Sequence, residues 1–265
     1  MNRTTLINFS FDDGRIDNYE IAYPILKKYH LPATFNITTG FVRGEQSLTS
    51  LAPSKPMTVE MVYKLYQDDA MEIAGHGYYH KNTIEDITQG IEELKRDLNT
   101  EKLTKLGNGF ASPGTGFRLD EYEIIKPKLD KLEIKYIRLS LRYLKYQGIK
   151  VFFRKISRII KFPLLYRWAY QDTLMQSIDN GLIYSIPVLS SISAEMLFAI
   201  IEYAEKHHMA CVLMFHSIVE DGHVRDNWDF ERSKFEKICS YLSERQSKDK
   251  LKVTTSMDIY QRLKK

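Results

Sequence analysis

Short apolar segments alternate with stretches of helical periodicity along most of this 265-residue chain. The first apolar segment, residues 5–11, is rich in β-forming residues and ends at Asp-Asp-Gly, a turn signal. Apolar residues then follow at helical spacing over 18–29, Pro32 ends that pattern, and 33–38 again has strand character. A strand, a helix and a strand within 40 residues predict a βαβ unit, and therefore a parallel sheet.

The same alternation continues to the end of the chain. The remaining strands are predicted near 71–76, 110–113, 182–188, 211–216 and 251–255, and the remaining helices near 58–67, 83–105, 193–207, 230–244 and the C-terminus. No linker, internal repeat or low-complexity segment interrupts the pattern, so we expect a single domain over residues 1–265. Such alternation favours a closed or nearly closed α/β barrel, in which the chemistry lies at the carboxyl ends of the strands.

Polar residues follow three of the predicted strands. The residues are Asp12, Asp13, His76, His80 and His216. Each group has an ordinary explanation when it is taken alone: Asp-Asp-Gly is a common turn, paired histidines occur on surfaces, and a histidine after an apolar run is often hydrogen-bonded and half-buried. Because parallel strands of a barrel end at one rim, however, we expect these side chains to meet.

Together these residues include the ligand types of a hydrolytic metal site. Two histidines four residues apart on a helical turn lie on one face, and a carboxylate completes a set that leaves open positions on a divalent ion. A second carboxylate can act as general base, and a histidine from another strand as general acid. Zinc suits these ligands, with cobalt, nickel and manganese as alternatives. The only cysteines, Cys211 and Cys239, exclude an all-thiolate site.

Four segments resemble motifs of the polysaccharide deacetylases, the NodB-homology or carbohydrate esterase family 4 group. Asn-Phe-Ser-Phe-Asp-Asp-Gly at 8–14 resembles the first motif, and Glu-Ile-Ala-Gly-His-Gly-Tyr-Tyr-His at 72–80 resembles the second. Phe-Ala-Ser-Pro-Gly at 110–114 lies where the third is expected, and Leu-Met-Phe-His at 213–216 resembles the last. Order and spacing agree along nearly the whole chain. The resemblance implies a distorted (β/α) barrel of about seven strands, similar to a TIM barrel.

The resemblance also implies a role for each matching residue. Asp12 would be the general base, and His216 would protonate the leaving amine. Pro113 and Gly114 would contact the substrate, with a backbone N–H near Gly114 helping to stabilise the oxyanion. The implied metal ligands are Asp13, His76 and His80. The implied reaction is metal-dependent removal of acetyl groups from N-acetylated sugar units of a polysaccharide, oligosaccharide or glycoconjugate precursor, in bacterial cell-surface polysaccharide assembly.

Two departures from the family pattern concern the groups that tune the base and the acid. The third motif usually carries an arginine two residues before its proline, which orients the base, but this chain has Ala111 there. The fourth motif, an aspartate and a tryptophan ahead of the last histidine, is not recognisable. In sequence order the nearest candidates are Trp168 and Asp172, so Asp172 is the candidate acid beside His216. The segment Asp-Asn-Trp at 226–228 comes after His216 and is out of order.

Positive charge is concentrated in one part of the chain. The chain has 38 Lys and Arg against 34 Asp and Glu, a net charge of +4. Ten of these cations and no carboxylate lie within 134–171, the basic insert, which leaves 28 basic against 34 acidic residues elsewhere, a balance of −6. Within the insert, Phe152, Ile156, Ile159 and Ile160 share one helical face. This pattern fits either a helix that packs its apolar face on the core or a basic amphipathic segment at an anionic membrane surface.

We therefore expect an acetylated carbohydrate as substrate, and an anionic membrane surface or the phosphates of a lipid-linked or nucleotide-linked sugar at the basic insert. No nucleic-acid motif accompanies the cations, so no nucleic-acid partner is expected. The N-terminus has no apolar stretch of signal-peptide length, which predicts a cytoplasmic protein, or one attached at the inner face of the membrane. The competing functions are hydrolysis of another amide or ester, such as an O-acetyl sugar or a cyclic amide, and non-catalytic binding of a carbohydrate or lipid.

Overall fold

The computed structural model describes residues 4–100, 106–114, 117, 119–141 and 147–265. Its main sheet contains β1 (Thr5–Phe11), β2 (Ala33–Ile37), β3 (Met71–Gly75), β4 (Leu106–Ala111), β5 (Tyr136–Leu139), β6 (Leu182–Pro187), β7 (Ala210–Phe215) and β10 (Leu251–Val253). Because β1 pairs with both β2 and β7, the parallel strands β1–β7 close into a barrel. The predicted α/β barrel is therefore confirmed.

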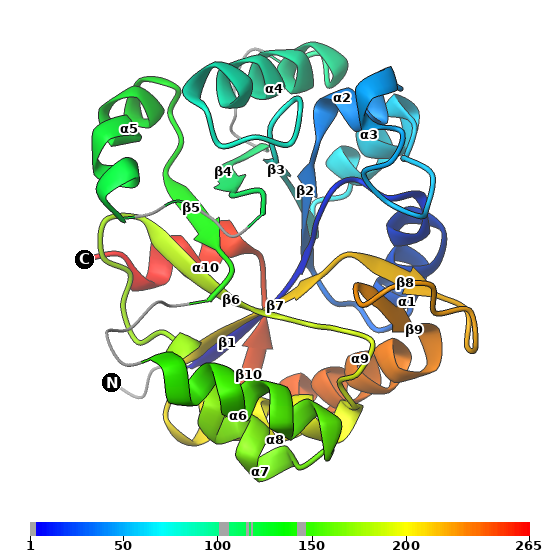
Figure 1. Ribbon diagram of the computed structural model, residues 1–265, viewed down its shortest axis with the longest axis vertical. Coiled ribbons are helices and arrows are strands. Elements are labelled where there is room, and N and C mark those ends of the chain that lie inside the picture. The colour runs from blue at the N-terminus through cyan, green and yellow to red at the C-terminus, as the bar shows by residue number, and fades with distance from the viewer. Residues whose placement is uncertain (1–3, 101–105, 115–116, 118, 142–146) are drawn as a thin grey trace.

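The barrel is distorted where β1 meets its neighbours. β10 pairs with residues 5–7 at the start of β1, whereas β2 pairs with Ser10 and Phe11 at its end. β1 thus has two different neighbours along the same edge. In Figure 1, which shows the strands at the centre and the helices around them, β10 lies beside β1 in the lower half of the ring.

Helices surround the strands, and a small parallel pair of strands follows β7. The helices are η1 (Asn18–Ala22, a π-helix), α1 (Tyr23–Lys28), α2 (Thr39–Val42), η2 (Gln46–Leu48), α3 (Val59–Gln67), α4 (Ile84–Asp97), α5 (Leu119–Lys131), α6 (Gln147–Ile159), α7 (Pro163–Tyr170), η3 (Gln171–Thr173), α8 (Ala194–Lys206), α9 (Arg232–Ser247) and α10 (Ser256–Leu263). The small pair is β8 (Ser217–Val219) with β9 (Asp229–Glu231).

Side-chain capping explains why several helices begin where the sequence predicts. The hydroxyls of Thr58, Thr83 and Ser193 each accept a hydrogen bond from the backbone N–H three residues later, at the start of α3, α4 and α8. α4 ends earlier than the predicted residue 105, because Asn99 takes a φ of 48° that a helix does not allow. Residues 101–105 lie outside the described part of the chain.

The barrel interior is polar, and the hydrophobic core lies between the strands and the helices. On β1, Phe9 and Phe11 point outward and pack on α9. Asn8 and Ser10 point inward and hydrogen-bond to side chains of β2. Since successive strand residues face opposite sides of a sheet, Asp12 continues the inward series as β1 ends. The alternation of β1 therefore delivers a carboxylate to the barrel mouth.

The basic insert contains two kinds of structure. Its first part is the barrel strand β5, which the sequence did not predict. Its second part is α6 and α7, which pack against each other, while α7 also packs on α8. Figure 1 shows α6 in front of α7 and α8. Two of the ten cations, Arg142 and Lys145, lie outside the described residues.

α6 does not pack its predicted apolar face on the core. Ile159 and Ile160 are exposed and Ile156 is half-buried, whereas Arg154 and Ser157 on the other side of the helix are buried. The interpretation of this segment as an ordinary core-packing helix is therefore wrong. No helix in the described ranges is both long enough and apolar enough to cross a membrane.

Candidate active site

The polar residues that follow β1, β3 and β7 meet in one pocket. The pocket has a volume of about 400 Å³ and lies at the carboxyl ends of the strands. The lining residues that the sequence singled out are Asp12, Asp13, His76, His80, Gly114 and His216. Residues more than 200 positions apart in sequence thus share one site because parallel strands end at the same rim.

Asp13, His76 and His80 form a cluster suited to a metal ion. One ligand atom from each lies within 4.8 Å of the others. Asp13 Oδ1 is 3.4 Å from His76 Nε2 and 3.5 Å from His80 Nε2. This oxygen is buried and accepts no hydrogen bond from any described residue. A buried carboxylate oxygen without a donor, facing two imidazole nitrogens, fits a divalent ion, because it otherwise lacks a partner.

Arg15 orients the Asp13 carboxylate toward the two histidines. Its Nε and Nη2 lie 2.9 and 2.8 Å from Asp13 Oδ2, and its Nη1 donates to Ser217 Oγ at 2.9 Å. With Oδ2 occupied in this way, Oδ1 is the oxygen left for a metal. Burial alone would raise the pKa of Asp13, but the positive charges of the surrounding His and Arg side chains hold it well below its usual value.

Both histidines of the cluster are in the form that binds a metal. His76 Nδ1 lies 2.8 Å from the carbonyl oxygen of Ala111. Because a carbonyl only accepts, Nδ1 carries the proton and Nε2 keeps its lone pair for a metal. Burial lowers the pKa of His80 to about 4, so this ring is neutral at pH 7.

The loop that carries these histidines is not a helical turn. Gly77 and His80 have φ values of 80° and 57°, which no α-helix contains. The carboxylate of Asp86 on α4 accepts two backbone N–H groups of the loop, and a Cβ on Gly77 would lie 2.3 Å from this carboxylate. The structure does bring the two imidazoles together, with centroids 4.8 Å apart. The predicted proximity holds, but the helical reason for it is wrong.

Asp12 is held by an arginine that the sequence motifs did not identify. Arg138 of β5 places its Nη2 2.5 and 2.6 Å from the two carboxylate oxygens of Asp12. Asn36 donates a further hydrogen bond to Oδ1 at 2.8 Å. Burial alone would raise the pKa of Asp12, but the charge of Arg138 outweighs it and keeps the pKa below its usual value. Asp12 is therefore ionised and oriented at neutral pH.

Arg138 stands beside the position of the arginine that the third motif lacks. Ala111, the residue at that position, is the register partner of Arg138 across the pairing of β4 with β5. Paired residues of neighbouring strands face the same side of a sheet, so β5 can deliver a guanidinium to the place that β4 serves in the family pattern. The sequence counted Arg138 among the cations of the basic insert, whereas the structure leaves it only 1% exposed.

His216 packs against a residue from the segment that is out of order. The ring of Trp228 lies 4.2 Å from that of His216, centroid to centroid, and Asp226 lines the same pocket. The buried Asp229 at the start of β9 shapes this segment by accepting hydrogen bonds from the backbone N–H of Arg225 and Asp226. A tryptophan that follows the histidine in sequence therefore lies against it in space.

The acid predicted beside His216 does not reach it. Asp172 instead pairs with Lys150 of α6, which corrects that prediction. Among the described residues, nothing hydrogen-bonds to the buried His216 Nδ1, while Nε2 lies 4.0 Å from Asp12 Oδ2. Burial lowers the pKa of His216, and the nearby carboxylates oppose this shift.

The predicted substrate-contact segment forms one edge of the pocket. Asn82 holds it, because its Nδ2 donates to the Pro113 carbonyl at 2.9 Å and its Oδ1 accepts from Ser112 Oγ at 2.8 Å. Gly114 lines the pocket and has a φ of 64°, which glycine adopts readily. The next two residues, Thr115 and Gly116, lie outside the described part of the chain.

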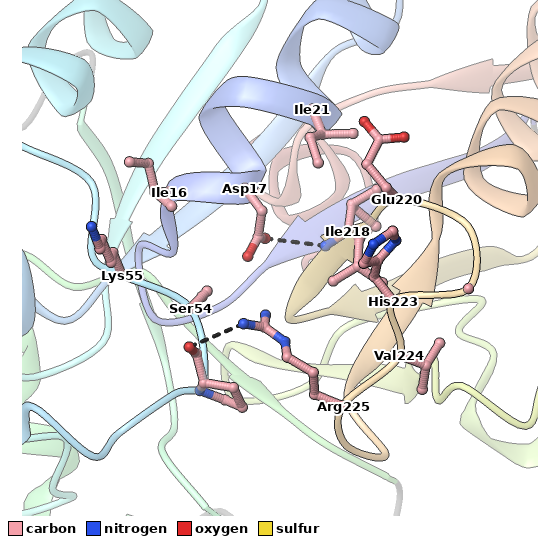
Figure 2. A pocket seen from close by; sticks show the side chains of 13 residues that line it. Ile16, Asp17, Ile21, Ser54, Lys55, Ile218, Glu220, His223, Val224 and Arg225 are labelled. Atoms are coloured by element: carbon pink, nitrogen blue, oxygen red, sulfur yellow. Dashed lines mark hydrogen bonds between the residues drawn. The ribbon is translucent and has the colours of Figure 1, made fainter.

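A second hollow of about 670 Å³ lies beside the catalytic pocket. The consecutive residues Arg225 and Asp226 line one hollow each. Figure 2 shows Asp17 and Arg225 projecting into it, and their hydrogen bonds join Asp17 Oδ1 to the N–H of Ile218 and Arg225 Nη1 to the carbonyl of Pro53. Asp17 Oδ2 is buried without a hydrogen-bond partner in the described structure, and burial raises the pKa of Asp17 to about 6.

Asp17→Asn is expected to stabilise the protein above pH 6 and to have little effect near pH 4. The folded protein keeps the Asp17 proton up to about pH 6, whereas an unfolded chain releases it near pH 4. The free energy of unfolding therefore falls as pH rises between these values, by up to about 3 kcal/mol, and the cost is fully present above pH 6. Urea unfolding in chelator at pH 4 and pH 8, with Asp249→Asn as surface control, measures this. An equal gain for Asp17→Asn at both pH values would contradict it.

A family model matches the first part of the chain. Residues 2–113 match the model described as "Polysaccharide deacetylase". The matched residues contain β1 to β4 and the Asp13, His76 and His80 cluster. No curated protein matches the sequence.

Solved structures share the barrel. A putative polysaccharide deacetylase from Mycobacterium smegmatis is 14% identical, over 99% of this chain and 91% of that one, with a TM-score of 0.53. The Streptococcus pyogenes deacetylase PplD in complex with acetate is 23% identical over 51% of this chain and 55% of its own, with a TM-score of 0.38. The BpsB deacetylase domain from Bordetella bronchiseptica is 13% identical over 52% and 64%, with a TM-score of 0.41. The matches span less than two thirds of the length of these last two proteins. The family match and the shared barrel show that the chain belongs to the polysaccharide deacetylase family.

Proposed function

We propose that the protein is a metal-dependent hydrolase that removes acetyl groups from N-acetylated sugar units of a polysaccharide, oligosaccharide or glycoconjugate precursor. The observation that carries the proposal is the Asp13 oxygen that faces two imidazole nitrogens without a hydrogen-bond donor. Beside it, in the same pocket, lies the ionised Asp12 held by Arg138. Metal ligands next to an ordered carboxylate are the parts that hydrolysis of an amide requires.

Asp13, His76 and His80 would hold the metal, for which zinc is the first choice. When bound, the ion supplies a Lewis acid for the acetyl carbonyl and lowers the pKa of water in the pocket. Asp12 takes the proton of the attacking water, and the contact with Arg138 keeps its carboxylate ionised and correctly turned for this step.

His216 completes the reaction by giving a proton to the leaving nitrogen. Water adds to the acetyl carbon, the carbon–nitrogen bond breaks, and the products are acetate and a sugar amine. The 4.0 Å distance between His216 Nε2 and Asp12 Oδ2 places the acid and the base on the same space, where one substrate group can meet both. Trp228 keeps the imidazole in this position by packing on its ring. Pro113 and Gly114 form the opposite edge for the substrate.

We further propose that residues 1–265 act as one catalytic domain in assembly of a bacterial cell-surface polysaccharide, on the cytoplasmic side of the membrane. The substrate would then be a precursor carried by a lipid or a nucleotide. The support is the positive charge of α6, whose Lys155 and Arg158 share a hollow with Asn227, next to the residues that wall the catalytic pocket. Cations in this position suit the phosphate groups of either precursor.

Release of acetate from acetylated oligosaccharides, sugar nucleotides and lipid-linked sugars tests the function. We expect release that stops in chelator and returns with zinc. Asp12→Asn is expected to keep one equivalent of metal but to lose kcat by about 10²–10⁴-fold, the range for a general base. His208→Asn, at the opposite end of the barrel, is the control and should change neither quantity.

Three results would overturn the proposal. Absence of acetate with zinc, cobalt, nickel or manganese would indicate a non-catalytic carbohydrate-binding or lipid-binding protein. Release from O-acetyl but not N-acetyl sugars would indicate an esterase. Normal turnover by Asp12→Asn would remove Asp12 from the role of base.

A further inference from the structure

The exposed apolar side chains of the protein gather on one surface. Among the described residues, thirteen large hydrophobic side chains are exposed, and eight of these lie between positions 149 and 168. We call this surface the α6–α7 face. Its members include Ile149, Phe152, Ile159, Ile160, Phe162 and Leu164, with exposed fractions between 48% and 69%. This concentration exceeds the scattered single residues that water-facing surfaces normally carry.

α6 is turned the opposite way from an ordinary surface helix. Its buried side carries Arg154, whose Nε donates to the carbonyl of Ala169 at 3.0 Å and whose guanidinium lies over the ring of Tyr170. Its outer side carries Phe152 and Ile159, which are 60% and 69% exposed. A helix that faces only water presents its charges outward and its apolar stripe inward. The orientation of α6 therefore indicates that its outer side meets an apolar environment.

Positive charge surrounds these apolar side chains. Lys155 and Lys161 are exposed and Arg158 is half-buried, and no carboxylate occurs anywhere within 134–171. The rest of the chain has an excess of six acidic residues. An anionic surface would attract the α6–α7 face and repel the remainder of the protein, so the charge distribution selects both the partner and the orientation.

We propose that the α6–α7 face docks on an anionic lipid bilayer, with its apolar side chains between the headgroups and the acyl chains and its cations on the headgroups. Apolar area combined with cations of a single sign is the pattern of interfacial helices. A second copy fits less well, because a two-fold interface would set Lys155, Arg158 and Lys161 against their own counterparts. The proposal rests on the proposed function for its substrate and names the surface on which that substrate is presented.

Docking in this way places the catalytic pocket at the membrane. Lys155 and Ile159 share a hollow of about 210 Å³ with Asn227. The chain neighbours of Asn227, Asp226 and Trp228, line the catalytic pocket. α6 therefore borders the wall of that pocket, and a sugar held at headgroup level can enter it while the helix lies in the interface. The substrate class that fits is an acetylated sugar on a lipid anchor.

Flotation with lipid vesicles tests the docking. The full chain is mixed with vesicles of phosphatidylcholine alone or of phosphatidylcholine with phosphatidylglycerol. We expect flotation with the anionic vesicles only, and weaker flotation at high salt. Lys155→Glu with Lys161→Glu should lower the partition coefficient about thirtyfold or more, since each lysine near an anionic surface contributes about fivefold. Phe152→Ser with Ile159→Ser should lower it by about tenfold per residue.

Matched control variants separate this surface from general effects. Lys128→Glu with Lys131→Glu makes the same change of charge on α5, and Ile124→Ser removes an exposed apolar side chain there. In Figure 1, α5 lies well apart from α6. Both controls should float like the unchanged protein. Thermal unfolding verifies that every variant is folded.

Several outcomes would overturn the docking proposal: no flotation of the unchanged protein with anionic vesicles, equal losses in patch and control variants, or a dimer that Phe152→Ser with Ile159→Ser converts to a monomer. Acetate release from a soluble acetylated oligosaccharide is measured on the same samples. The patch variants should release acetate at the unchanged rate. Loss of flotation with normal release therefore separates failure of docking from failure of the proposed function.

Discussion

Arg138→Met is expected to abolish acetate release and to lower the free energy of unfolding by about 3–5 kcal/mol. The change removes the guanidinium that lies within 2.6 Å of both oxygens of Asp12 and leaves a buried carboxylate with no compensating charge. Burial then dominates and raises the pKa of Asp12, so the carboxyl holds its own proton and cannot accept one from water. Metal content should stay near that of the unchanged protein, because Arg138 does not contact Asp13, His76 or His80 in the described structure.

A double variant separates stability from catalysis. Arg138→Met combined with Asp12→Asn removes both charges and is expected to recover most of the lost stability, but none of the activity. Arg245→Met is the matched control, because its partner Glu205 is partly exposed and such a pair contributes about 1 kcal/mol or less. Urea unfolding and acetate release measure the four variants. Turnover by Arg138→Met with an unchanged pH profile would show that Arg138 does not position the base.

His80→Ala is expected to remove bound metal and activity together. It deletes one of the ligand nitrogens within 4.8 Å of the others, and two remaining ligands hold zinc poorly. Acetate release should fall by about 10³-fold or more, because the Lewis acid is lost with the metal. Asp13→Ala should have the same effect on metal and rate, with an added loss of stability because Arg15 loses its carboxylate partner.

Metal analysis after dialysis, beside acetate release, measures this prediction. His216→Ala is the control for loss of a histidine from the same pocket: it should keep the metal and lose only rate, since its ring is not in the ligand cluster. If His80→Ala retained one equivalent of metal and full turnover, the assignment of the ligand cluster would be wrong.

The strands and helices that the sequence predicted correctly have strong local signals. β1 is a continuous run of β-forming residues that ends at a turn, and α3 and α8 begin at capping hydroxyls. β5 had no such signal. It is four residues long and contains Arg138, and an arginine in sequence argues against a buried strand. Burial of this side chain is possible only because the carboxylate of Asp12 lies opposite, and that pairing joins residues 126 positions apart.

The candidate site shows the same division. Asp12, Asp13, His76, His80 and His216 were identifiable because each follows a predicted parallel strand. Asp172 and the out-of-order tryptophan were misjudged because the motif comparison follows the order of the chain. At a barrel rim, a loop from any neighbouring strand can cover the same pocket, and Trp228 reaches His216 from the start of β9. Chain order therefore does not determine which side chain packs on the acid.

The sequence by itself determined the alternation of strands and helices, the ligand types at the strand ends, and the uneven charge of the chain. These properties are local or compositional, so no contact between distant residues is needed to read them. Only the tertiary structure decided that Arg138 belongs to Asp12, that Arg15 turns Asp13 toward the histidines, and that α6 presents its apolar side outward. The reason is physical: the place of a charge or an apolar face depends on what lies opposite it, and the fold alone brings those partners together.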